Sequence, residues 1–226
     1  MSTLSAGLIM ALFIVLGIVF TMAVSKLLSK TLLKGISSSF VLELPPYRRP
    51  KVGSIIIRSL LDRTLFVLAR AVCVAAPAGL IIWIMGNVRL GDVSLLSLSV
   101  DFFQPFGRLI GVDGVIVVAF ILSFPANEIL IPIMLMGYMA TGVLTDYTSL
   151  SQLQGILQDA GWTSQTALSV MLLCLFHFPC ATSCLTVKKE TGSWKWTGLS
   201  ILLPAASGTL ICLIINMAVQ LFHLIS

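Results

Sequence analysis

The sequence has 226 residues, of which 58% are hydrophobic and only 10% are charged, and its net charge is +5. Soluble globular domains carry about 25% charged residues, so this composition excludes a water-soluble domain and predicts a polytopic membrane protein. The basic residues cluster beside apolar stretches, as in cytoplasmic loops that face anionic lipid, and therefore do not indicate binding to nucleic acid.

The first apolar stretch, residues 6–24, is about long enough to cross a bilayer. It is longer than the core of a signal peptide, which has about 7–15 residues, and no Lys or Arg precedes Lys26. We therefore expect residues 1–25 to form a first transmembrane span that is retained.

Residues 26–63 form a strongly basic segment, with eight Lys and Arg residues against Glu43 and Asp62. Such an excess is typical of cytoplasmic loops, so the N-terminus is expected outside. The middle of the segment is rich in proline and should be extended, and residues 54–63 have the spacing of an interfacial helix.

A second span is predicted over residues 65–85, with Pro77 inside it as a source of a kink. Residues 86–113 follow without a basic excess and are expected outside. They contain a group of aromatic residues and a proline that predicts a short helix lying in the membrane interface or dipping into it: Phe102, Phe103, Pro105 and Phe106.

Residues 114–137 are apolar but should be broken twice, at Pro125 and Pro132. Asn127 and Glu128 lie between these breaks. A carboxylate at membrane depth is costly and often marks an ion path, so both are candidate ligands of a transported ion. The alternative is a structural Glu128 that is hydrogen-bonded to a neighbouring helix or a helix N-terminus.

The stretch over residues 167–187 contains a third break, at Pro179, with His177 before it. If a helix resumes there, Cys180 and Cys184 lie on one of its faces, because they are four residues apart. An imidazole and two thiols suit a borderline-soft divalent metal rather than Mg²⁺ or Ca²⁺. Both thiols could instead be small hydrophobic core groups.

The basic residues also test the topology, because Lys188, Lys189 and Lys195 precede a last span over residues 197–222. If every apolar stretch crossed once, these lysines would lie outside. They lie inside if residues 114–137 enter the membrane and return as two half-helices. We therefore predict an all-α membrane helix bundle with Pro-broken, re-entrant gate helices, in which residues 64–226 form a gate-type domain.

Two breaks share a Phe-Pro-small pattern, at residues 124–126 and 178–180. Paired broken segments are the best sequence indication of a transporter's binding site.

Several longer motifs resemble the ferrous iron transport protein B (FeoB) family, in that family's order. They are LELPPYRRP at residues 42–50, RSLLDRTLFVLARA at 58–71, SFPANEILIP at 123–132 and FPCATSC followed by KKETGSWKW at 178–196. The resemblance covers the C-terminal membrane half of the family, including its second gate region. It implies a multi-pass protein of the bacterial inner membrane that carries Fe²⁺ as its cargo, with no permanently bound cofactor.

The resemblance also implies partners, because the family couples transport to a GTPase domain. This sequence has no GxxxxGK[ST] phosphate loop and should neither bind nor hydrolyse GTP, so we expect no enzyme activity. The GTPase domain or the N-terminal membrane half would belong to a separate chain. A second copy of the chain and the lipid bilayer are further expected partners.

Two other functions remain open at the level of sequence. The gate region also resembles domains named for nucleoside recognition, which would use aromatic side chains of the stretch: Phe176, Phe178, Trp194 and Trp196. The third function is a structural membrane subunit that binds the rest of a transporter.

Overall fold

The computed structural model describes residues 3–31, 53, 57 and 64–225. It divides the chain into two compact units, residues 1–60 and 61–226. Most of the predicted basic loop and nearly all of the predicted interfacial helix at 54–63 lie outside the described residues.

In the first unit, α1 runs from Thr3 to Thr31, and Leu4–Thr31 is long and apolar enough to cross a membrane. The helix continues beyond residue 25, the expected end of the first span. The reason is local, because residues 25–31 contain no Gly or Pro and include good helix formers such as Leu27 and Lys30.

The second unit opens with α3, Phe66–Asn87, which contains a candidate span at Val67–Asn87. Pro77 lies inside α3 without ending it. A short hairpin follows, in which β1 (Arg89–Leu90) pairs antiparallel with β2 (Val93–Ser94). Its turn contains Gly91 with a φ of 70°, a conformation that glycine adopts without strain.

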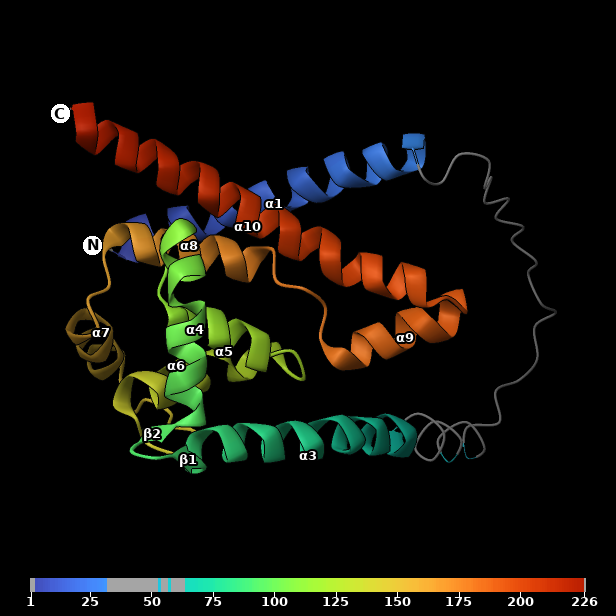
Figure 1. Ribbon diagram of the computed structural model, residues 1–226. Coiled ribbons are helices and arrows are strands. Elements are labelled where there is room, and N and C mark those ends of the chain that lie inside the picture. Colours follow the sequence, from blue (N-terminus) through green and yellow to red (C-terminus); the bar gives the residue numbers. More distant parts are fainter. Residues whose placement is uncertain (1–2, 32–52, 54–56, 58–63, 226) are drawn as a thin grey trace. The chain divides into compact units, whose positions relative to one another are not determined.

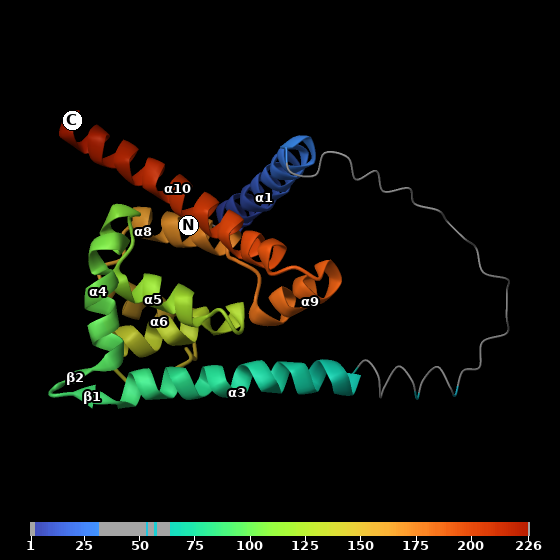
Figure 2. The same cartoon turned by 45° about the vertical axis from the view of Figure 1, so that its right-hand side comes forward.

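The next helix, α4 (Leu95–Leu109), begins at Ser94, whose side chain accepts a hydrogen bond from the backbone N–H of Ser97. It is followed by α5 (Gly114–Leu122), and the two helices meet at an angle of 108°. In Figures 1 and 2, α4 runs across the direction shared by α3 and α5. The short helix predicted from its aromatic residues is therefore present as α4.

The predicted hairpin of half-helices is confirmed. After α5, a 3-10 turn η2 (Asn127–Ile129) leads into α6 (Leu130–Met139). A Cβ on Gly137, near the end of α6, would lie 2.7 Å from Cγ1 of Val115, near the start of α5. The chain therefore reverses direction between α5 and α6.

The predicted break at Pro132 is wrong, because this residue lies in the first turn of α6. A proline is tolerated there, since the first N–H groups of a helix have no intrahelical acceptor. This segment is broken only between α5 and η2, at the residues around Pro125.

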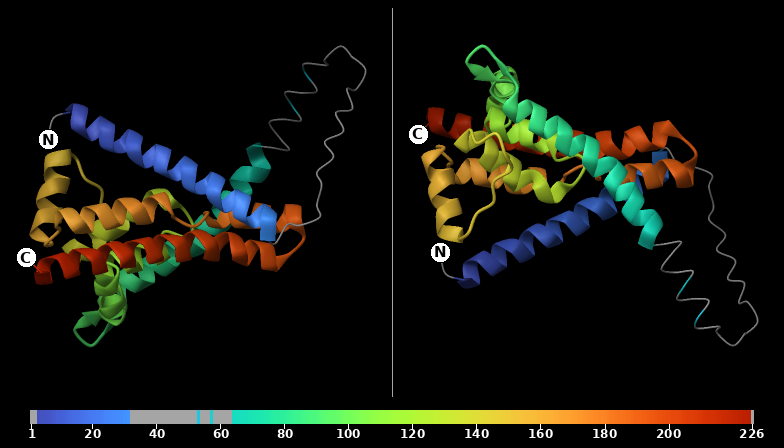
Figure 3. Two further views of the ribbon diagram at one scale, coloured as in Figure 1. Left: turned by 90° about the horizontal axis from the view of Figure 1, so that it is seen from above. Right: turned by 90° about the horizontal axis from the view of Figure 1, so that it is seen from below.

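In the rest of the chain, two shorter helices lie beside a long one. After α7 (Leu150–Asp159), α8 (Ser164–Leu175) and α9 (Ala181–Thr191) both pack against the long α10 (Trp194–Ile225). Cys212 of α10 contacts the carbonyl of Ser169, and Gly208 contacts Phe176, so α8 runs antiparallel to α10. Figure 3 shows α8 and α9 along α10 from above and below.

The bundle has a buried centre and two chemically different ends. Ile116 of α5 and Ile133 of α6 are almost fully buried. At one end, Nη1 of Arg70 donates to Oγ1 of Thr186, which brings the start of α3 beside α9 and its lysines. At the other end, Asn87 of α3 donates to the carbonyl of Gly142.

Candidate functional site: two helix breaks in contact

The two Phe-Pro-small breaks touch each other in the folded chain. The backbone N–H of Ala181, at the start of α9, donates to the carbonyl of Phe124 over 2.9 Å. The rings of Phe124 and Phe178 also pack, with centroids 5.7 Å apart. Two segments that are more than fifty residues apart in the sequence are thus joined by a hydrogen bond between backbone groups that have no partner within a helix.

A second contact joins the same breaks through side chains. Ser123 is fully buried, and its Oγ lies 3.1 Å from Nε2 of His177. The other ring nitrogen, Nδ1, lies 2.8 Å from the carbonyl of Phe178, to which it can only donate. Both nitrogens of His177 are therefore occupied, and the imidazole must leave Ser123 before Nε2 can bind an ion.

Cys180 lies at the tip of the second break, as the N-cap of α9. Its half-buried Sγ lies 3.1 Å from Oγ1 of Thr182 and 3.3 Å from Oγ of Ser183. Hydroxyl donors and the positive end of a helix dipole both stabilise a negatively charged sulfur. Cys180 is thus the thiol placed best to act as a soft ligand.

Cys184 lies one turn further along α9, and its backbone N–H donates to the carbonyl of Cys180. Its side chain is only 5% exposed, and Sγ lies 3.4 Å from the carbonyl of Pro179. The thiol hydrogen is therefore directed at a backbone oxygen of the break. Cys184 supports the turn that carries Cys180 and is less accessible to an ion.

Asn127 and Glu128 lie on η2, immediately after the first break, and both side chains are exposed on this chain. Neither side chain forms a hydrogen bond or an ion pair with another described residue. Within the described part of the chain, no three His, Cys, Asp or Glu residues form a group that could hold a metal ion. The structure thus brings His177 and both thiols to one break, while Glu128 and Asn127 stand on the other.

The aromatic residues that nucleoside recognition would use do not share one binding pocket. Phe176 and Phe178 line an apolar cavity of about 170 Å³ that contains no amide side chain. Trp194 lies at the start of α10, where Nζ of Lys188 is 3.7 Å from the centre of a Trp194 ring. Stacking and amide pairing of a nucleobase therefore have no common site among these residues.

Comparisons with known proteins assign the part of the chain that contains both breaks to a protein family. A family model described as Nucleoside recognition, the gate family, matches residues 68–194, more than half of the chain. The chain belongs to the gate family. A second model, described as Ferrous iron transport protein B C terminus, matches residues 10–62.

Curated relatives of this gate-family chain are iron transporters by name. The Fe(2+) transporter FeoB of Staphylococcus aureus strain MSSA476 is 26% identical over 223 residues, which are 92% of this chain and 31% of the relative. A Porphyromonas gingivalis Fe(2+) transport protein A/Fe(2+) transporter FeoB fusion protein is 24% identical, over 88% of this chain and 29% of its own length. The chain thus spans less than a third of the length of the iron transporters that it matches. No solved structure matches.

Sequence reasoning missed the group that joins the two gate-family breaks, which is Ser123. A serine immediately before a Phe-Pro break was the available signal, because buried serines need a hydrogen-bond partner. Reasoning from sequence also missed a polar network that holds the helix ends: the Asp113 carboxylate accepts from Tyr138 at 2.6 Å, and Trp162 donates to Tyr138 at 2.9 Å.

Proposed function

We propose that this chain forms part of the ferrous-ion path of a GTPase-coupled iron transporter. The observation that carries the proposal is the contact between the two breaks, through Ala181 with Phe124 and His177 with Ser123. Broken helices leave backbone oxygens unpaired and bring ligand side chains to the middle of a membrane protein. The family of the relatives, named for Fe(2+) transport, supports the choice of ion.

In this mechanism Cys180 is the first protein ligand, because its side chain is less buried than that of Cys184 and hydroxyl groups surround its sulfur. Fe²⁺ is borderline-soft and accepts thiolate, imidazole and oxygen ligands. His177 becomes a ligand when its Nε2 leaves Ser123, and Cys184 contributes when its turn opens. A small, incomplete ligand set suits transport, because an ion that is bound too tightly cannot leave.

Glu128 and Asn127 are proposed helpers on the opposite break. A charged carboxylate is stable at membrane depth only beside protein or water, so we expect another part of the transporter to cover η2. Glu128→Gln should lower Fe²⁺ flux and change its pH dependence. Unchanged flux at every pH would leave Glu128 with a structural role only.

The proposed partner is a GTPase domain or an N-terminal membrane half on a separate chain, which would couple GTP hydrolysis to the ion path. The proposed site of action is the bacterial inner membrane.

The test is uptake of radioactive Fe²⁺ by proteoliposomes that contain the chain with and without the GTPase-bearing half. Iron-dependent accumulation that requires both, and that falls on Cys180→Ser but not on Cys212→Ser, would support the proposal. Accumulation of a nucleoside without iron flux would favour the alternative solute. Assembly with the other half and no effect of Cys180→Ser would indicate a structural subunit.

A further inference from the structure

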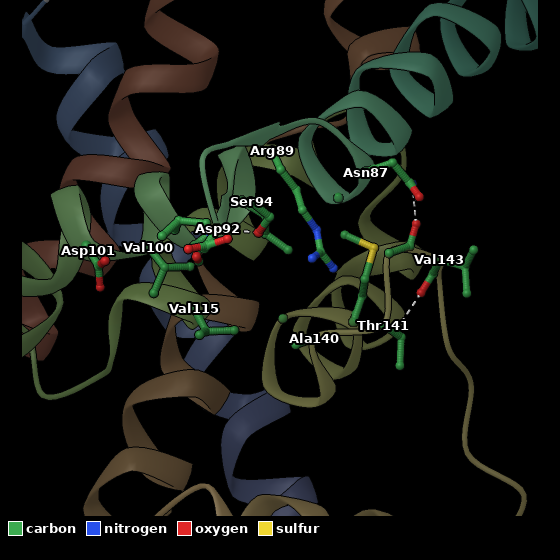
Figure 4. A pocket seen from close by; sticks show the side chains of 17 residues that line it. Asn87, Arg89, Asp92, Ser94, Val100, Asp101, Val115, Ala140, Thr141 and Val143 are labelled. Atoms are coloured by element: carbon green, nitrogen blue, oxygen red, sulfur yellow. Dashed lines mark hydrogen bonds between the residues drawn. The ribbon is translucent and has the colours of Figure 1, made fainter.

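A cavity lined partly by polar and charged residues lies at the end of the bundle where α3 stops. Its volume is about 640 Å³, and it is formed by the end of α3, the β1–β2 hairpin, the first turns of α4 and the loop after α6 (Figure 4). Its lining includes the buried side chains of Leu96 and Met136. The cavity is separate from the two breaks and shares no lining residue with them.

Three charged side chains line this cavity: Arg89, Asp92 and Asp101. Figure 4 shows the side chain of Arg89 extending from the hairpin into the cavity. None of the three side chains forms a hydrogen bond or an ion pair within the described part of the chain. A guanidinium and two carboxylates are thus available to a ligand on one surface.

The rim of the cavity is held in place by the fold. Nδ2 of Asn87 donates to the carbonyl of Gly142 over 2.6 Å and to the carbonyl of Trp83 over 3.0 Å. A Cβ on Gly86 would lie only 3.2 Å from the oxygen of Gly142, so the loop after α6 closely approaches α3. In the hairpin, Arg89 is paired with Ser94, which fixes the base of the arginine side chain.

The charges select a ligand that carries both signs. A simple anion would be attracted by Arg89 but repelled by the two carboxylates, and a hydrated cation would meet the opposite conflict. A phosphate can form a charge-assisted bond with the guanidinium while a primary ammonium donates to Asp92 or Asp101. A quaternary ammonium has no N–H group and cannot make the second contact.

The position of the cavity identifies where such a ligand comes from. Asn87 is the last residue of the candidate span Val67–Asn87, and Arg89 and Asp92 follow directly. Residues at this position lie where the hydrocarbon layer ends and lipid headgroups begin. The apolar residues Leu96 and Met136 in the same cavity would contact the start of an acyl chain.

We propose that this cavity binds a phospholipid headgroup of the phosphoethanolamine class, with the phosphate on Arg89 and the ammonium on Asp92 and Asp101. The bound lipid would tie the hairpin to α4 and the loop after α6. The proposal does not depend on the ion that the two breaks carry.

The test is native mass spectrometry of the purified chain in micelles with equal amounts of phosphatidylethanolamine, phosphatidylcholine and phosphatidylglycerol of identical acyl chains. The wild type should retain phosphatidylethanolamine preferentially. Arg89→Gln and Asp92→Asn should each reduce its retention by about tenfold, as expected for the loss of one charge-assisted hydrogen bond. Asp159→Asn, at the exposed end of α7, is the matched control and should change nothing.

Circular dichroism and thermal unfolding of each variant separate lipid loss from misfolding, and Asp92→Asn preserves side-chain shape. Equal retention of the three lipids would overturn the proposal. So would retention of phosphatidylethanolamine by well-folded Arg89→Gln and Asp92→Asn. If phosphatidylglycerol were retained as well as phosphatidylethanolamine and only Arg89→Gln reduced both, the cavity would be a simple anion site, which also contradicts the proposal.

Discussion

Oγ of Ser123 lies 3.1 Å from Nε2 of His177, and this pair joins two helix breaks that are 54 residues apart in the sequence. The serine hydroxyl also lies 2.9 Å from the carbonyl of Phe120. When the proton of a neutral His177 is on Nδ1, the Ser123 hydroxyl has one hydrogen and two possible acceptors, Nε2 of His177 and the carbonyl of Phe120. The hydroxyl can therefore turn from His177 to Phe120, which makes the contact between the breaks easy to release, as a gate requires.

The first prediction concerns this contact. Ser123→Ala removes the partner of Nε2, and an unpaired buried polar group costs about 1–3 kcal/mol. We expect the two breaks to separate more often and Cys180 to react several-fold faster with a membrane-permeant alkylating reagent, measured by mass spectrometry. Ser200→Ala is the control, because that hydroxyl donates to the carbonyl of Thr197 within its own helix. An unchanged rate at Cys180 would show that the serine does not hold the breaks together.

The second prediction ranks the cysteines. Even groups that only support a metal ligand change affinity about 10–100-fold when removed, so Cys180→Ser should lower Fe²⁺ uptake by the assembled transporter at least about tenfold. Cys184→Ser should have a smaller effect, since its buried sulfur faces the carbonyl of Pro179. Cys73→Ser and Cys212→Ser should have the least. Equal losses at all four positions would indicate a folding defect.

The third prediction concerns the packing of α8 against α10. A Cβ on Gly208 would lie 2.9 Å from Cβ of Phe176, the residue before His177. Overpacking costs about 1–3 kcal/mol, so Gly208→Ala should lower the midpoint of thermal unfolding by about 2–4 °C per kcal/mol. A Cβ on Gly198, on the same helix, would have no neighbouring atom within 4 Å, so Gly198→Ala should be neutral or slightly stabilising. If both variants behaved alike, Gly208 would not be a close-packing position.

The fourth prediction concerns sidedness. In an otherwise cysteine-free chain, Ser151→Cys on α7 should be labelled in intact cells, and Glu190→Cys beside the lysines of α9 only after permeabilisation. Ser38→Cys, in the basic loop, should behave like Glu190→Cys because basic loops are retained in the cytoplasm. Labelling of Glu190→Cys or Ser38→Cys in intact cells would show that the chain has the opposite orientation in the membrane.

The sequence was sufficient for features that depend on local chemistry and apolar length. It predicted the spans now seen as α3 and α10, the crosswise helix α4 and the return of the chain between α5 and α6. The last of these followed from a conflict of charge, since the lysines near residue 190 could not lie inside otherwise. Pro132 was misjudged because the cost of a proline depends on its position in a helix, and the start of α6 could not be located from the sequence.

Long-range contacts could not be predicted from the sequence. The resemblance between residues 124–126 and 178–180 suggested a pair of breaks but not that Ser123 would join His177. The cavity around Arg89 depends on four segments that meet only in the fold, and no local pattern marks it. The exposed position of Glu128 depends on how η2 is oriented, which its sequence does not determine.

The most direct test of the account is protection of Cys180 by Fe²⁺. The assembled transporter is treated with a membrane-permeant alkylating reagent under anaerobic conditions, with Fe²⁺ or with Mg²⁺, and modification is measured at each cysteine. Fe²⁺ should slow alkylation of Cys180, while Mg²⁺ should not, because thiolates favour the softer ion. The exposed Cys73 and Cys174 serve as internal controls and should react at unchanged rates. Equal alkylation of Cys180 with either ion would contradict an ion path through the two breaks.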